Sequence, residues 1–165
     1  MRFAPLLAFS LALAATSLGP LGVAPAAAES VYHRGNSGEP ETLDPHKTST
    51  VPESNVLRDL FEGLVAHDAR GEPAPGAAQS WTISPDGKVY TFKLRADAKW
   101  SNGDPVTAED FAFSFRRLQD PATAGKYAAV LYPVKNAEKV NKGQLPPAEL
   151  GVRAVDPLTF EVTLE

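Results

Sequence analysis

The side chains with the clearest potential for chemistry in this 165-residue chain lie in Asp44-Pro45-His46. A carboxylate and an imidazole can ligate a metal or transfer protons, but two ligands do not complete the four-ligand set that zinc prefers. His33 and His67 have no partner at metal-ligand spacing, and the chain contains no cysteine. The signatures G-x-S-x-G, H-E-x-x-H and the P-loop do not occur. The sequence therefore predicts no enzyme activity, no metal site and no cofactor.

A second candidate site consists of backbone, in Ser49-Thr50-Val51. Val51 precedes Pro52, and a residue before proline is biased toward extended backbone. Pro52 has no N–H and interrupts strand pairing on its side. An extended tripeptide that cannot join a longer strand keeps backbone groups for a ligand, whereas the alternative is an ordinary loop leading into a helix. Glu53 is interpreted as a helix-end and surface charge.

Residues 79–117 contain the most regular secondary-structure pattern of the sequence. Two strands, 80–83 and 89–94, flank a turn rich in Pro, Asp and Gly. Thr107 caps a following helix, and Asp110 complements the dipole at its start. We expect both tryptophans of this segment, Trp81 and Trp100, to lie in the core.

Further elements flank this segment. A helix is predicted from Pro52, with an apolar stripe that reaches Leu64 and a C-cap at Gly63. We also predict a short strand at 31–34, a short helix at 136–141 and a hairpin of 151–155 with 159–164.

The order of residues within 79–117 is more specific than its secondary structure. It comprises Trp81, Ser84, Asp86-Gly87, Tyr90-Thr91-Phe92, Leu94-Arg95, Trp100, Gly103, Pro105, Ala108, Asp110 and Ser114. This order resembles the diagnostic segment of the peptide- and nickel-binding proteins of bacterial ABC importers, although Asn102 stands where Asp is expected. The likeness extends over residues 43–47, 51–55, 58–64 and 74–76, which are most similar to the oligopeptide-binding members.

The resemblance implies an α+β fold of the two-lobed periplasmic binding protein type (type II, cluster C-like). Residues 29–61 would begin the larger lobe, and residues 62–165 would form most of an incomplete smaller lobe. Members of the family are several hundred residues longer, so we expect this sequence to be the front part of such a protein.

The resemblance also assigns site residues. Ser49, Thr50 and Val51 occupy the place of the peptide-contacting segment, and Tyr127 matches a tyrosine that faces the ligand. For Tyr127 the alternative is a half-buried surface tyrosine. Ser49 stands where a carboxylate is expected, which removes a charge contact from this position. The acidic partner of the peptide amino group would lie outside this sequence.

Residues 1–28 have the pattern of a secretory signal peptide. Arg2 is their only charge, Gly19-Pro20 ends an apolar run, and Ala26-Ala27-Ala28 offers small residues before a cleavage site after Ala28. A membrane anchor is the alternative, but the run is short for a span. Without cysteine there is no lipidation site. We therefore expect a soluble periplasmic protein.

The expected partners are oligopeptides, bound extended between lobes that close about a hinge, and an ABC permease. We expect a monomer. The net charge of −4, with both signs interspersed, predicts no nucleic-acid partner. Alternatives within the fold are a dipeptide, a murein peptide, haem or nickel as ligand. Alternatives of another class are a secreted hydrolase and a chaperone-like periplasmic module.

Overall fold

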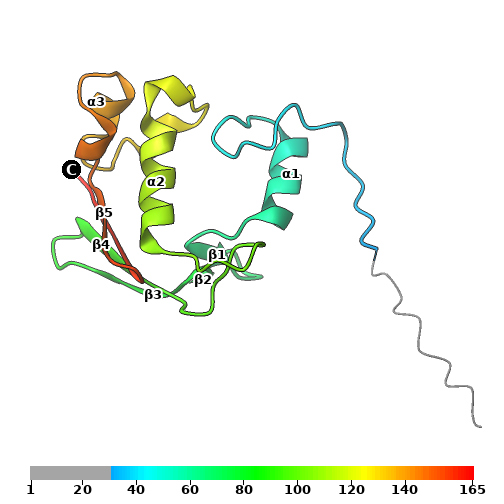
Figure 1. Ribbon diagram of the computed structural model, residues 1–165, viewed down its shortest axis with the longest axis horizontal. Coiled ribbons are helices and arrows are strands. Elements are labelled where there is room, and N and C mark those ends of the chain that lie inside the picture. The colour runs from blue at the N-terminus through cyan, green and yellow to red at the C-terminus, as the bar shows by residue number, and fades with distance from the viewer. Residues whose placement is uncertain (1–30) are drawn as a thin grey trace, which may run out of the picture. The chain divides into compact units, whose positions relative to one another are not determined.

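An antiparallel sheet of four strands, in the order β3-β4-β6-β5, carries the core of this computed structural model (Figure 1). The strands are β3 (Ala78–Ile83), β4 (Val89–Leu94), β5 (Val152–Asp156) and β6 (Thr159–Thr163). The structure describes residues 31–165, of which Gly35–Glu165 form one unit. Both predicted hairpins are confirmed, and pairing of β4 with β6 joins them into one sheet.

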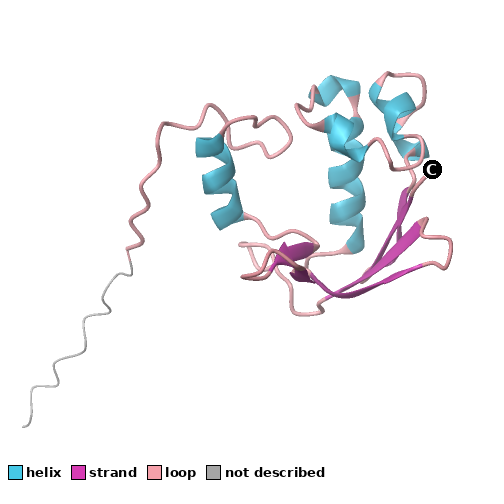
Figure 2. Ribbon diagram, turned by 180° about the vertical axis from the view of Figure 1, so that it is seen from behind, coloured by secondary structure: helices cyan, strands magenta, loops and turns pink. Residues whose placement is uncertain are grey.

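Helix α2 (Ala108–Gln119) covers one face of this sheet, with α3 (Ala137–Asn141) beside it (Figure 2). Its predicted start is confirmed, because the Asp110 carboxylate accepts hydrogen bonds from the Thr107 backbone N–H (2.7 Å) and hydroxyl (2.9 Å). Phe111 and Phe115 point onto Phe160 of β6, with ring centroids 6.0 and 5.3 Å apart. The capped helix is therefore fixed to the sheet by aromatic packing.

The core lies between the sheet and the helices on that face. Phe160 is fully buried and contacts rings from both layers. The other members of the core are small or aliphatic, namely Ala78, Leu94, Ala108, Ala112, Val134, Ala137, Val140, Leu150, Val152 and Val162. Alanines on α2 allow close approach of helix and sheet, while Phe160 supplies the largest apolar area.

The remaining elements are short. They are α1 (Val51–Leu60), β1 (Val65–His67), β2 (Pro73–Pro75), α3 (Ala137–Asn141) and 3₁₀ helices at Pro121–Thr123, Ala128–Leu131 and Pro147–Glu149. β1 and β2 form a separate antiparallel pair. The helix predicted from Pro52 begins one residue earlier and ends with Phe61 as its C-cap, so the prediction of Gly63 as the cap is wrong. Residues 31–34 form no strand, which corrects that prediction too.

The α+β fold class is confirmed by this mixture of a helix layer and antiparallel strands.

Trp81 is half-buried, but Trp100 is exposed, so the prediction that Trp100 lies in the core is wrong. Its loop bonds to itself, with the Trp100 N–H donating to the Asp104 carbonyl oxygen. The predicted signal peptide lies outside the described residues. Within residues 31–165, every helix is too short or too polar to span a bilayer.

Candidate functional site

Ser49, Thr50 and Val51 lie at the start of α1. Thr50 is the N-cap and has extended backbone (φ −114°, ψ 159°), but Val51 is already the first helical residue. The predicted extended conformation is therefore correct for Thr50 and wrong for Val51. The helix begins there despite Pro52 because the capping arrangement of Thr50 with Glu53 competes with the proline bias.

Glu53 determines how this segment uses its backbone. Its carboxylate accepts hydrogen bonds from the N–H groups of Ser49 (2.8 Å) and Thr50 (2.9 Å). The residue is only 2% exposed, so its interpretation as a surface charge is wrong. Donation from Ser49, then from Thr50, holds the pKa of Glu53 below its usual value. Two donors that the sequence suggested for a ligand are thus bound to Glu53, which leaves carbonyl oxygens and side chains.

Tyr127 lies beside this segment, although 78 residues separate it from Ser49. Its hydroxyl donates to the Ser49 carbonyl oxygen over 3.4 Å, a long hydrogen bond. The Tyr127 residue is 58% exposed, and Ser49, Thr50 and Val51 are exposed as well. The structure therefore brings all four predicted site residues to one accessible place.

A polar cluster fastens the preceding loop to α2. The Arg117 guanidinium donates to both carboxylate oxygens of Asp44, at 2.8 and 2.6 Å, and lies 2.6 Å from His46 Nδ1. The other ring nitrogen, Nε2, lies 3.0 Å from Ser114 Oγ. The Arg117 hydrogen bonds hold the pKa of Asp44 well below its usual range. Asp44 and His46, the pair with metal-ligating potential, are therefore engaged by protein groups.

The same loop is also tied to the segment that carries Tyr127. The carbonyl oxygen of His46 accepts a hydrogen bond from the Lys126 N–H at 3.1 Å. Gly125, next to Lys126, packs so closely that an added Cβ would lie 2.7 Å from the Leu118 carbonyl oxygen. Loop 44–50 is thus held by α2 on one side and by residues 125–127 on the other.

Sequence reasoning missed two residues of this arrangement. Glu53 had a local signal, the capping pattern of Thr50 with Glu53 three positions later. Arg117 had none, because its partner Asp44 is 73 residues away. Nothing in the spacing of either residue indicates that contact.

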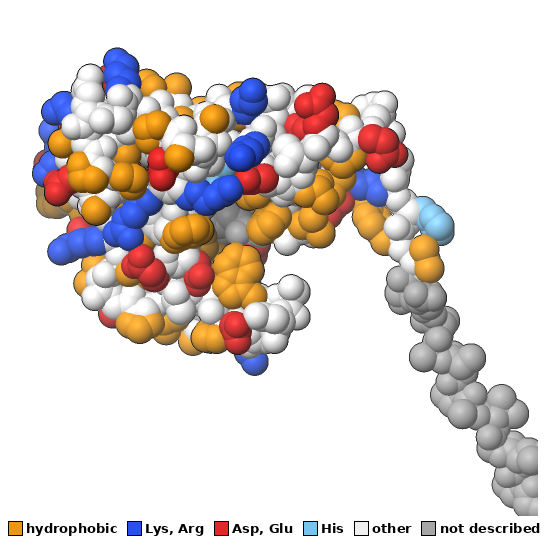
Figure 3. All heavy atoms as spheres, turned by 45° about the horizontal axis from the view of Figure 1, so that its top comes forward, with side chains coloured by type: hydrophobic (Ala, Val, Ile, Leu, Met, Phe, Trp, Pro, Cys, Tyr) orange, Lys and Arg blue, Asp and Glu red, His pale blue; other side chains and the backbone are white. Residues whose placement is uncertain are grey.

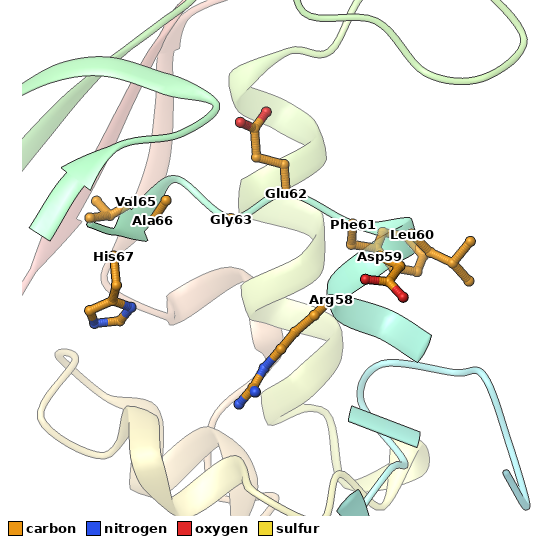
Figure 4. A pocket seen from close by; sticks show the side chains of 9 residues that line it. All are labelled: Arg58, Asp59, Leu60, Phe61, Glu62, Gly63, Val65, Ala66 and His67. Atoms are coloured by element: carbon orange, nitrogen blue, oxygen red, sulfur yellow. The ribbon is translucent and has the colours of Figure 1, made fainter. Parts of the chain in front are cut away.

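An open depression follows α1, where the chain leads into β1 (Figure 4). Arg58 and His67 point to one side of this connection and Glu62 to the other. Glu62 pairs with Arg95, 2.6 Å apart, and Glu62 is exposed while Arg95 is partly buried. Figure 3 shows acidic and basic side chains sharing the visible face of the molecule. Among residues 31–165 there is no group of three or more potential metal ligands.

The comparison with protein families agrees with this architecture. The model for bacterial extracellular solute-binding proteins, family 5 Middle, matches residues 72–165, more than half of the chain. The chain belongs to this family. The matched part contains the sheet, α2 and Tyr127, while the loop 44–50 and α1 precede it.

Individual family 5 members are similar over a longer stretch. The periplasmic oligopeptide-binding protein OppA of Haemophilus influenzae is 57% identical over 129 residues, 77% of this chain and 24% of its own length. OppA of Escherichia coli is 49% identical over 163 residues, 98% of this chain and 29% of its own. The chain therefore spans less than a third of the length of these curated relatives.

Solved structures of family 5 members share the fold. The crystal structure of H. influenzae OppA in complex with RPPGFSPFR has a TM-score of 0.73 and 56% identity, covering 76% of this chain and 25% of that one. The murein tripeptide-binding protein MppA of E. coli has a TM-score of 0.74 and 46% identity, covering 77% and 25%.

Proposed function

We propose that this chain is part of the substrate-binding component of a bacterial ABC importer for oligopeptides. The observation that carries the proposal is the likeness to H. influenzae OppA, a relative solved with the peptide RPPGFSPFR and 56% identical over 76% of this chain. Identity of 49% to E. coli OppA over nearly the whole chain supports the same ligand class. The role is binding rather than catalysis.

Ser49, Thr50, Val51 and Tyr127 are the residues proposed to contact the peptide. A peptide bound in extended form offers backbone N–H and C=O groups to short protein segments. Because Glu53 holds the N–H groups of Ser49 and Thr50, this segment would contribute carbonyl oxygens and side chains. The exposed ring of Tyr127 offers an apolar surface with a hydroxyl at its end.

The transport step is proposed as hinge closure in the periplasm. A monomer would bind the peptide between two lobes, close, and dock on a membrane permease. We place the start of the larger lobe in residues 29–61 and the smaller lobe in residues 62–165. The contacts of Asp44 and His46 with α2 cross this proposed boundary, so both parts would contribute to one wall of the site.

Calorimetry with tri- to pentapeptides tests the proposal in two proteins. One is this chain, for which we expect weak binding or none, because it spans less than a third of the length of its relatives. The other is a chimera of H. influenzae OppA in which the 129 matching residues are replaced by their counterparts from this chain. The chimera is expected to bind peptides, and its failure to bind any peptide while folded would contradict the proposal.

Tyr127→Ala in the chimera tests the site itself. We expect at least a severalfold loss of peptide affinity from removal of the ring. Val130→Ala is the matched control, because Val130 is also exposed and lies just after Tyr127 in the same 3₁₀ region. Equal affinities of the two variants would remove Tyr127 from the proposed site.

A murein peptide is the second candidate ligand. MppA of E. coli is 46% identical over 129 residues, 77% of this chain, compared with 57% for H. influenzae OppA and 49% for E. coli OppA. Competition between a murein tripeptide and a linear tripeptide for the chimera separates the two. Stronger binding of the murein peptide would favour this alternative, and the same assay with a dipeptide, haem and nickel covers the other ligands.

A further inference from the structure

The hydrogen bonds around His46 define the form of its ring. Arginine has only donors, so His46 Nδ1, 2.6 Å from Arg117 Nη1, must be the acceptor. The proton of the neutral ring is therefore on Nε2, which donates to Ser114 Oγ at 3.0 Å. Both nitrogens are used, and the intact cluster is compatible with one tautomer of the neutral imidazole.

Protonation of this ring would break the arrangement. A proton on Nδ1 would direct an N–H at the N–H of Arg117 and place two positive charges together. The negative charge of Asp44 favours the protonated ring, but both carboxylate oxygens of Asp44 are already bound to Arg117. Burial of the ring and then the charge of Arg117 lower the pKa of His46, in agreement with the geometry. The third neighbouring charge, on Lys126, belongs to a residue that contacts His46 through its backbone N–H.

The backbone of His46 connects the two parts of the proposed site, segment 49–51 and Tyr127. Its N–H donates to Asp44 Oδ1 at 3.1 Å, and its carbonyl oxygen accepts the Lys126 N–H at 3.1 Å. Ser49 follows three residues later in the chain, and Tyr127 follows Lys126. Movement of His46 would therefore displace Ser49 and Tyr127 relative to each other.

We propose that His46 is a positioning residue that, as a neutral imidazole between Ser114 and Arg117, fixes segment 44–51 on α2 and releases it when protonated. The expected consequence, weaker peptide binding in acid, rests on the proposed function of Ser49–Val51 and Tyr127. The release itself does not, because it is a property of the loop without ligand.

Amide hydrogen exchange in the whole chain without ligand measures the release. The Lys126 amide reports the contact with His46, and the Leu94 amide, bonded to the Leu158 carbonyl at 2.8 Å, reports the core. Protection factors remove the intrinsic pH dependence of exchange. The chain has three histidines, so the double variant H33Q/H67Q leaves His46 as the single imidazole that titrates. His33 and His67 are exposed and outside the cluster.

In wild type and H33Q/H67Q, protection of the Lys126 amide should decrease as the pH is lowered below about 6.5, by at most about tenfold per pH unit. Protection of the Leu94 amide should stay constant over the same range. A Gln side chain can accept one hydrogen bond through its oxygen and donate another through its nitrogen. H46Q should therefore keep protection of the Lys126 amide at pH 7.5 and show no change in this protection down to pH 5. H46A should lose Lys126 protection at both pH values. A flat Lys126 profile in H33Q/H67Q would overturn the proposal, whether or not H46Q folds. An unchanged pH profile in folded H46Q would overturn it too.

Peptide affinity of the chimera between pH 5 and 7.5 separates this inference from the proposed function. A fall in affinity that H46Q abolishes supports both. Release at Lys126 with pH-independent peptide affinity supports the positioning role of His46, while it contradicts the assignment of Ser49–Val51 as peptide contacts. No binding at any pH, with release intact, contradicts only the proposed function.

Discussion

Two regions of this molecule are held together by different forces. The sheet and α2 bury apolar side chains around Phe160, and burial of apolar area is non-directional and insensitive to pH. Loop 44–50 and α1 are held by charged and polar groups, and the one fully buried residue of α1 is Glu53. The same chain thus builds a scaffold from hydrophobic packing and an attachment from hydrogen bonds.

This difference separates stability from function. All four proposed peptide contacts lie at the polar attachment or beside it, and none belongs to the hydrophobic core. Polar clusters depend on protonation state and on the geometry of each hydrogen bond. Changes in the core should therefore alter global unfolding, whereas changes in the attachment should alter local order at Ser49 and Tyr127.

The comparison is tested most strongly at Phe160. Phe160→Ala removes a fully buried ring that contacts Phe92, Phe111 and Phe115, and should lower the free energy of unfolding by about 3–5 kcal/mol. Urea denaturation measures this loss. Phe113→Ala on α2 is the control, because Phe113 is 62% exposed, and its effect should stay within about 0.5 kcal/mol. Similar losses for both variants would show that the core is not centred on Phe160.

A smaller effect is expected where core and attachment meet. In Gly125→Ala the new Cβ would lie 2.7 Å from both the Leu118 carbonyl oxygen and its Cδ1, so residues 125–127 must move away from α2. We expect a loss of about 1–3 kcal/mol in unfolding free energy and lower amide protection at Lys126. In the control Gly38→Ala the nearest atom would be Pro52 Cγ, at 3.8 Å, and stability should change little. Unchanged Lys126 protection in Gly125→Ala would separate this glycine from the loop.

The smallest global effect, but a clear local one, is expected at Glu53. The pKa of Glu53 is lowered in the folded protein, so its stabilisation of the folded segment is complete above the ordinary pKa of glutamate. This stabilisation is lost as the pH falls through the lowered pKa. Protection of the Ser49 and Thr50 amides should therefore decrease in acid. In the H46Q background, in which His46 no longer titrates, Glu53→Gln should reduce that protection at neutral pH and remove its remaining acid dependence.

Glu62→Gln is the control for that measurement, because Glu62 is exposed and pairs with Arg95 rather than with the loop. The two amides should exchange as in wild type in this variant. Acid-dependent protection that persists when Glu53→Gln is combined with H46Q would assign the effect to another carboxylate.

Much of the fold was predictable because its signals are local. The Thr107 cap, the two hairpins and the short helix at Ala137–Asn141 each depend on residues within a few positions of one another. The capping pattern at Thr50 and Glu53 was equally local, although it indicates a buried carboxylate only when α1 and its loop are seen together. The exposure of Trp100 was not predictable, because it depends on whether its loop folds onto the sheet or onto itself.

Local patterns along the chain were enough to predict the two hairpins of the four-stranded sheet, the helix capped by Thr107 and the resemblance to one family, which the comparison then confirmed. The pairing of Asp44 with Arg117 and the contact of Tyr127 with Ser49, across 73 and 78 residues, depend instead on how the elements pack. Periodicity, caps and turns act within about one helical turn or one hairpin, so they carry no information on such distant pairs. These contacts form because packing of α2 on the sheet fixes where Ser114 and Arg117 lie, and the loop then binds to them.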